Sequence, residues 1–206
     1  MHDIKVFGIG FHKTGTSSLS VALTYLGYKV MGYFGVDDPD IKYNVYKQAE
    51  SYVNRYDAFQ DNPWPIIYKE MDQKFPGNKF ILTERPTEQW IISTVDHFST
   101  SSSPLHEWIY GIGFPKGNEA LWIKRYEDHN QEVREYFKDR PDDLLIMDFS
   151  RGEGWEKLCP FLNKKILKSK FPHFNKKVDI GKKPKDRTLL HRAYYKFRRK
   201  FGGLDA

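Results

Sequence analysis

The sequence predicts an α/β fold with three layers, in which helices cover both faces of a central parallel sheet. Four short apolar runs are nearly continuous, as in strands that are buried on both faces. Segments with apolar residues at helical spacing alternate with these runs, which favours parallel strands joined by crossover helices. We expect strands at residues 4–10, 57–60, 79–83 and 144–147, and helices at residues 17–26, 40–54, 66–75, 87–98 and 119–138.

Length and composition indicate one domain spanning residues 1–206. With 39% hydrophobic and 16% aromatic residues, the chain is too apolar to be disordered and long enough to bury a sizeable core. A mean hydropathy of −0.68 argues against an integral membrane protein, and no apolar run approaches the roughly 20 residues that span a bilayer. The N-terminus lacks the pattern of a secretory signal, and the single Cys159 cannot form an intramolecular disulfide. We therefore expect a cytoplasmic protein.

The positive charge gathers near the C-terminus. The formal net charge is +6 and the pI is about 9.1, which favours an anionic partner. Residues 176–200 contain 11 Lys or Arg and two Asp, so the rest of the chain is slightly acidic. This basic C-terminal segment, 176–206, follows an expected irregular stretch at 162–185 and contains an expected helix at 186–201. That helix either docks its apolar stripe on the domain or contacts an anionic surface, with nucleic acid the less favoured partner.

The strongest chemical signal follows the first expected strand, where Gly-Phe-His-Lys-Thr-Gly-Thr-Ser-Ser-Leu runs from Gly10 to Leu19. Amides at a helix N-terminus lack intrahelical partners and carry the positive end of the helix dipole, so they bind phosphate or sulfate oxygens. Lys13 adds a positive charge, and the hydroxyls add donors. The ATP-binding order G-x-x-x-x-G-K-[ST] is not met because Lys13 precedes Gly15, and the dinucleotide order G-x-G-x-x-G fails at Lys13. A simple capped turn needs fewer donors, so we expect an anion-binding loop.

The order G-x-x-K-T-G-T-[ST]-[ST]-L resembles the 5′-phosphosulfate-binding loop of sulfotransferases that use 3′-phosphoadenosine 5′-phosphosulfate (PAPS). It is closer to the loop of the bacterial and glycan-type enzymes than to the P-K-S-G-T-T-W loop of the cytosolic aryl and steroid enzymes. The resemblance implies a P-loop NTPase-like fold, PAPS as the sulfuryl donor, adenosine 3′,5′-bisphosphate (PAP) as the product, and no metal. It also implies cofactor contacts from His12, Lys13, Thr14, Gly15, Thr16, Ser17 and Ser18.

Arg85 and Ser93 carry the second part of the resemblance. Sulfotransferases have an Arg at the end of the equivalent strand and a Ser eight residues later, and these bind the 3′-phosphate of the cofactor. Arg85 and Ser93 have this spacing, and an Arg fork with a hydroxyl donor suits a phosphate. The similarity covers residues 4–175 and includes His129 and Cys159, which we expect to be structural.

The resemblance implies transfer of a sulfuryl group to a hydroxyl or amine, which needs positive charge beside the transferring group and a base for the acceptor. Lys13 is expected to supply the charge. Asp61 is the candidate base, because the family places a catalytic His, Glu or Asp near this edge of the cleft. His12 and His97 are rival candidates, whereas Asp57 begins its strand and is expected at the far end.

Two other functions compete with this interpretation. A P-loop kinase or other phosphotransferase is suggested by Asp148, which follows an apolar strand as the Mg²⁺-binding Asp of those enzymes does. A non-catalytic nucleotide- or polyanion-binding protein is suggested by the basic segment 176–206. The scattered His residues and single Cys give no metal-binding pattern.

The acceptor is expected to be a small molecule or a glycan. The segment 98–118 either lines the acceptor pocket or packs over the sheet. The C-terminal R-K-G-x-x-G-x-W-K loop of the cytosolic sulfotransferases is absent from the sequence. Candidate substitutes for its phosphate contacts are Lys182, Lys183 and Lys185.

Overall fold

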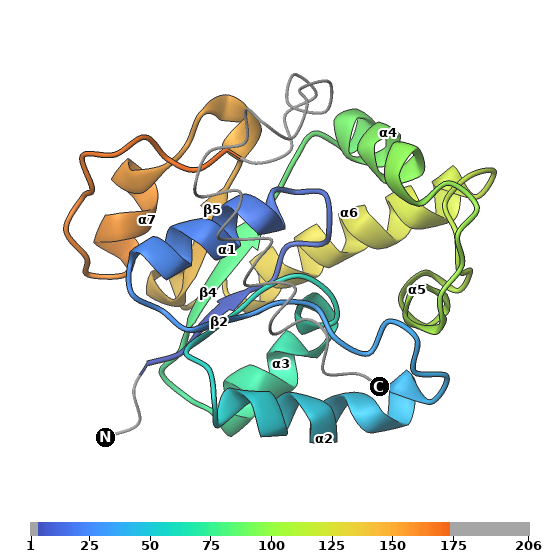
Figure 1. Cartoon of the computed structure of the whole chain (residues 1–206), viewed down its shortest axis with the longest axis horizontal. Helices are drawn as coiled ribbons and strands as arrows, with labels where there is room; N and C mark the ends of the chain where they lie inside the picture. Colours follow the sequence, from blue (N-terminus) through green and yellow to red (C-terminus); the bar gives the residue numbers. More distant parts are fainter. Residues whose placement is uncertain (1–3, 174–206) are drawn as a thin grey trace, which may run out of the picture. The chain divides into compact units, whose positions relative to one another are not determined.

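Five parallel strands form the central sheet of the computed structural model, which describes residues 4–173 (Figure 1). The central strand, β1 (Val6–Gly8), lies between β3 (Ala58–Phe59) and β4 (Lys79–Thr83). The edge strands are β2 (Val30–Met31), beside β3, and β5 (Leu144–Met147), beside β4. Because all pairs are parallel, the carboxyl ends of the strands meet at one edge, where ligands bind in sheets of this kind.

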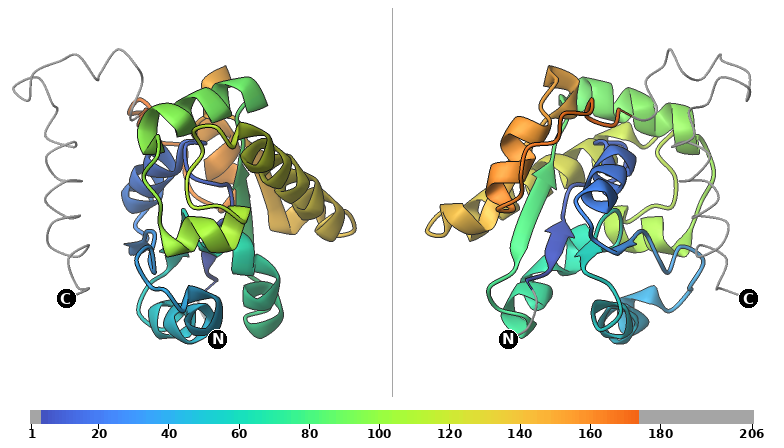
Figure 2. Two further views of the ribbon diagram at one scale, coloured as in Figure 1. Left: turned by 90° about the vertical axis from the view of Figure 1, so that its right-hand side faces the viewer. Right: turned by 60° about the vertical axis from the view of Figure 1, so that its left-hand side comes forward.

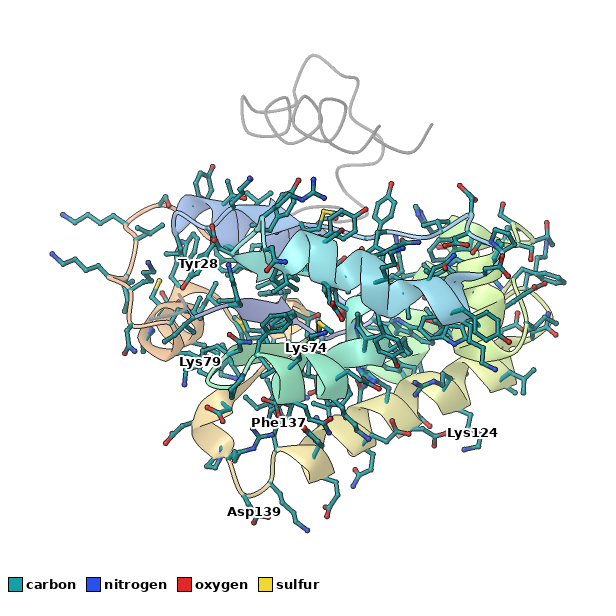
Figure 3. All side chains as sticks on the ribbon, turned by 90° about the horizontal axis from the view of Figure 1, so that it is seen from below. Tyr28, Lys74, Lys79, Lys124, Phe137 and Asp139 are labelled. Atoms are coloured by element: carbon teal, nitrogen blue, oxygen red, sulfur yellow. The ribbon has the colours of Figure 1, made fainter. Side chains whose placement is uncertain are left out.

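Helices cover both faces of the sheet. They are α1 (Thr16–Tyr25), α2 (Ile41–Val53), α3 (Trp64–Lys74), α4 (Thr87–Phe98), α5 (Pro104–Tyr110), α6 (Glu119–Tyr136) and α7 (Trp155–Phe161), with short 3-10 turns η1 (Pro141–Asp143) and η2 (Phe149–Arg151). In the left view of Figure 2 the strands lie between α1 on one side and α6 on the other. In Figure 3, Lys124 projects from the outer side of α6, where it is exposed.

Alternate side chains of each strand enter two separate cores. Val6 and Ala58 pack with α1 and α7, whereas Phe7, Phe59 and Phe80 pack with the helices of the opposite face. Successive side chains of a strand point to opposite faces, so a strand covered on both sides must be apolar throughout. This burial explains the continuous apolar runs in the sequence. The predicted fold class, a P-loop NTPase-like three-layer α/β/α arrangement, is confirmed.

The predicted elements agree closely with the observed ones. β4, β5 and α4 begin and end at the predicted residues, and the other predicted elements within the described chain match to within two residues at each end. Three elements were not predicted. β2 is two residues long, α5 spans a single short segment that begins with Pro104, and α7 contains Pro160, so none shows a long periodic pattern.

The described residues from 4 to 172 belong to one compact unit. The expected irregular stretch at 162–185 is described only as far as residue 173, and that part forms neither helix nor strand. The expected helix at 186–201 and the basic segment 176–206 lie outside the described residues, as do Lys182, Lys183 and Lys185. Within the described part of the chain, no helix is long and apolar enough to cross a membrane.

Candidate active site

Glycine allows the turn after β1 to lie directly against the end of β4. A Cβ atom on Gly10 would lie 2.1 Å from Thr83 Oγ1 and 2.2 Å from the Thr83 carbonyl oxygen, so a larger residue does not fit. Gly15 has a φ of 104°, in the left-handed region, and a Cβ atom there would lie 2.5 Å from the ring of Phe149. These close approaches fix the loop at the carboxyl edge of the sheet.

The hydroxyl of Thr14 faces the interior and shapes this loop. Thr14 Oγ1 donates to the Phe11 carbonyl oxygen at 2.6 Å and lies 2.6 Å from Thr83 Oγ1. Because its hydrogen goes to Phe11, Thr14 accepts the hydrogen of Thr83. Thr14 was expected among the cofactor contacts. Its side chain joins the loop to β4, and its contact with a cofactor stays a prediction.

His12 also points inward, which corrects the expectation that its side chain faces a ligand or acts as a base. Its Nδ1 lies 2.9 Å from Asn62 Nδ2, and its Nε2 lies 3.3 Å from the Tyr110 hydroxyl. Burial, followed by the nearby His106 and Lys13, lowers the pKa of His12 well below its ordinary value. The His12 ring is neutral, and both of its nitrogens have hydrogen-bond partners inside the protein. It is therefore unsuited to remove a proton from an acceptor substrate.

Lys13 lies at the centre of a group of charges. Burial lowers the pKa of Lys13, Arg85 lowers it further, and Asp61 and Asp96 oppose the shift. Charged groups from the turns after β3 and β4 and from α4 therefore all act on Lys13. Lys13 itself has a φ of 66°, so the backbone turns sharply where the side chain leaves the loop.

The N-terminus of α1 adds backbone donors beside Lys13. The helix begins at Thr16, and Ser17 and Ser18 belong to its first turn. The amides of a first turn have no intrahelical acceptor, and the helix dipole makes this end positive. Ser17 is partly exposed, whereas Thr16 and Ser18 are buried. The amides and the hydroxyl residues of this first turn are therefore suited to bind an anion.

Asp61 lies at the end of β3, directly beside this helix start. Its Oδ2 accepts a hydrogen bond from Thr16 Oγ1 at 2.9 Å, and its Oδ1 accepts one from the amide of Asn62 at 2.8 Å. The residue has a φ of 73° and is partly exposed. The sequence placed Asp61 at the same edge as the loop, and the structure brings it next to Thr16 and Lys13. By contrast, Asp57 pairs with Lys5 and the amide of Lys29, away from this group.

The turn after β4 is bonded to the same loop. Trp90 of α4 donates from Nε1 to the His12 carbonyl oxygen at 2.9 Å. The hydroxyl of Tyr126 donates to the Arg85 carbonyl oxygen at 2.8 Å and accepts from the Arg85 amide at 2.9 Å. Burial raises the pKa of Tyr126 to about 12, so the hydroxyl stays protonated. Arg85 keeps its guanidinium partly exposed, with Nε 3.4 Å from Gln89 Oε1.

Helix α4 carries three further polar residues beyond this turn. Ser93 is partly exposed, and Asp96 and His97 are exposed. Asp96 was not predicted from the sequence, although its position three residues after Ser93 puts both on neighbouring sites of one helix face. Asp96 acts on Lys13 electrostatically and His97 acts on His12, so this part of α4 borders the group around Lys13.

Asp148, on which the kinase alternative rests, is bonded within its own turn. It follows β5, which pairs with β4 and not with β1. Its Oδ1 accepts from the Ser150 amide at 2.8 Å, and its Oδ2 lies 3.3 Å from Arg151 Nε. Among residues 4–173, no group of three or more His, Cys, Asp or Glu side chains is arranged to hold a metal ion.

Two residues expected to be structural are buried in the described fold. His129 donates from Nε2 to the Ile9 carbonyl oxygen at 2.7 Å, and Cys159 belongs to the core beneath α1 and α7. In the segment 98–118, Tyr110 stacks on Trp122 at 3.7 Å and His106 is 7% exposed. These two side chains are packed in the interior, and a role of the segment in an acceptor pocket stays a prediction.

Two comparisons with known proteins concern the family to which the chain belongs. A family model described as a sulfotransferase domain matches residues 5–180. The chain is also similar to Ava biosynthesis cluster protein M of Aspergillus versicolor, with 25% identity over 218 aligned positions that cover 82% of this chain and 80% of that protein. The family match includes the loop from Gly10 to Leu19 and the turn at Arg85. The chain therefore belongs to the sulfotransferase domain family.

Proposed function

We propose that the chain transfers a sulfuryl group from PAPS to a hydroxyl or amine of an acceptor. The observation that carries the proposal is the meeting of Lys13, the N-terminus of α1 and Asp61 at one edge of the sheet, with Arg85 on the adjoining turn. Cationic and amide donors suit the anionic end of a nucleotide, and a carboxylate beside them suits a base.

Each residue has a defined role in this proposal. Lys13 and the first amides of α1 bind the 5′-phosphosulfate and offset the negative charge that develops there during transfer. Arg85 and Ser93 bind the 3′-phosphate. Asp61 accepts the proton of the acceptor, and Thr16 orients its carboxylate through the hydrogen bond to Oδ2. PAPS supplies the activated sulfuryl group.

We further propose a small-molecule acceptor in preference to a glycan. The similar protein from Aspergillus versicolor is named for a biosynthesis cluster, and this name is what supports the preference. The acceptor side of the site includes the exposed part of α4 with Asp96 and His97. An acceptor panel of phenols, alcohols, amines and short glycans tests this preference.

Calorimetry with PAP in the presence of EDTA tests donor recognition. Lys13→Ala and Arg85→Ala should each weaken PAP affinity about ten- to hundredfold, because each removes a charge-assisted contact. Lys124→Ala and Arg151→Ala are matched controls, since both side chains are exposed and pair with a nearby carboxylate. Equal effects in the controls, or binding of Mg²⁺–ATP in place of PAP, would contradict the proposal.

Radiolabelled PAPS then tests the reaction itself. Incubation with the acceptor panel should yield a labelled product, and Lys13→Ala should abolish its formation. PAP binding without labelled product from any acceptor would favour a non-catalytic nucleotide-binding protein.

A further inference from the structure

Lys13 and Asp61 both occupy backbone conformations that side chains disfavour. Their φ angles are 66° and 73°, in the left-handed region. Such a conformation is disfavoured for residues other than glycine, less so for Asp than for Lys, and it persists when the surroundings enforce it. The two residues whose charges meet at the proposed site therefore depend on contacts made by their neighbours.

One buried hydrogen bond joins the sequence neighbours of these two residues. His12 precedes Lys13, Asn62 follows Asp61, and His12 Nδ1 lies 2.9 Å from Asn62 Nδ2. The two side chains are 5% and 3% exposed. A bond in a water-excluded position is more costly to break than one on the surface, so it holds the two turns at a fixed separation.

The pattern of donors fixes the state of the His12 ring. An amide nitrogen only donates, so Nδ1 of His12 accepts and the ring proton lies on Nε2, which faces the Tyr110 hydroxyl at 3.3 Å. A doubly protonated ring would place two donors against each other at Nδ1. Tyr110 is fixed in turn, because its ring stacks on Trp122 at 3.7 Å.

The backbone carbonyl groups of His12 and Asn62 also accept hydrogen bonds from neighbouring segments. The His12 carbonyl oxygen accepts from Trp90, which belongs to the helix that follows Arg85. The Asn62 carbonyl oxygen accepts from the amide of Phe34, beyond β2. The backbone carbonyl groups of His12 and Asn62 therefore join this pair to α4 and to the segment that follows β2.

We propose that His12 and Asn62 are positioning residues that set the geometry of Lys13 and Asp61 through their mutual hydrogen bond, with Tyr110 fixing the orientation of the His12 ring. They contact neither donor nor acceptor and act only through the two charged residues. This inference rests on the proposed function for the identity of the ligand that Lys13 and Asp61 meet.

A pair of substitutions separates positioning from packing. His12→Leu keeps much of the ring volume and loses the bond to Asn62, whereas His12→Asn keeps a bonding group near Nδ1 and loses volume. PAP affinity by calorimetry should fall about five- to tenfold in His12→Leu and recover in His12→Asn. Unfolding in urea measures the stability of each variant separately, since His12→Asn leaves a cavity and His12→Leu leaves the Asn62 amide without its acceptor. Affinity that follows stability would overturn the proposal.

A double-mutant cycle then tests whether His12 acts through Lys13. In a Lys13→Ala background, His12→Leu should change PAP affinity less than about twofold, because the group it positions is gone. His106→Leu is the matched control, since His106 lies in the same aromatic cluster and its ring centroid is 5.5 Å from that of His12. This control should leave PAP affinity unchanged in both backgrounds. An equal loss for His12→Leu with and without Lys13 would refute the inference.

A second measurement does not depend on PAP. The pKa of the Lys13 ammonium group, followed by NMR of labelled lysine, should move in His12→Leu and stay constant in His106→Leu. If the unmodified protein fails to bind PAP, the proposed function fails, while this titration still decides the positioning role. An unchanged Lys13 titration in His12→Leu would overturn the inference alone.

Discussion

Asp61 and Asp148 each follow a parallel strand at the same edge of the sheet, yet their carboxylates have different partners. Asp61 accepts from Thr16, 45 residues away in the sequence, and acts on Lys13. Asp148 accepts from the amide and hydroxyl of Ser150, only two residues away, and pairs with Arg151. The Asp61 carboxylate links the turn after β3 to the start of α1, whereas the Asp148 carboxylate bonds within its own turn.

The order of the strands explains this difference. β3 pairs directly with β1, so the turn after β3 lies beside the loop that carries Lys13. β4 lies between β1 and β5, so the turn after β5 is one strand further away. Asp61 therefore bonds to a residue of another turn, at the N-terminus of α1, whereas Asp148 caps its own turn and contributes to its stability.

The largest expected effect is a loss of sulfuryl-transfer activity when Asp61, but not Asp148, is substituted. Asp61→Asn should lower the rate of sulfuryl transfer about 10²- to 10⁴-fold, because the amide cannot accept the acceptor's proton. Asn tolerates the left-handed backbone at this position, so the fold should be kept. Transfer of label from PAPS to the best acceptor of the panel measures the loss. Asp148→Asn is the control, and an equal loss in both variants would remove the distinction between them.

A smaller effect concerns pH and the buried histidines behind the loop. Burial lowers the pKa of His106 to about 4 and that of His129 to about 3. Unfolded histidine binds a proton near pH 6.5, so below that pH the unfolded chain holds more protons than the native one and stability falls. From pH 7 to pH 5, each histidine should lower the free energy of unfolding by about 2 kcal/mol.

Urea unfolding at the two pH values measures this loss. His106→Phe should reduce the difference between pH 7 and pH 5, because one titrating group is removed. Hydrogen exchange at pH 5 should increase more in the β1–α1 turn than in η2, since His12 and His129 contact the first region. The same pH dependence in His106→Phe would show that this histidine does not contribute.

The smallest expected effect belongs to the second carboxylate. Asp148→Ala should lower the free energy of unfolding by about 1 kcal/mol, because the carboxylate caps η2 through the Ser150 amide. PAP affinity should remain unchanged. A tenfold loss of PAP affinity in this variant would place Asp148 in the donor site and contradict the comparison with Asp61.

Much of the fold was predictable because its signals are local. Continuous apolar runs marked β4 and β5 to the residue, and helical spacing marked α4. β2 and α5 escaped prediction because each is too short to show a period. Their positions depend on pairing with β3 and on packing against α6, which are contacts between residues far apart in the sequence.

The candidate site divides in the same way. The loop from Gly10 to Leu19 and the Arg85–Ser93 pair were recognisable from residue order alone. The inward direction of His12 and Thr14 was not recognisable, since residues in a turn give no periodic signal for burial. Asp96 was missed for a related reason, because its effect on Lys13 arises only when α4 packs beside the loop.

The sequence by itself determined the α/β class and the place of the loop from Gly10 to Leu19 after the first strand, because these follow from short-range pattern. Only the tertiary structure decided which carboxylate accompanies Lys13. That choice depends on strand order, which is set by contacts across the whole sheet. The same contacts bury His12, which was expected to contact the cofactor or to act as a base, and bond its ring to Asn62 and Tyr110.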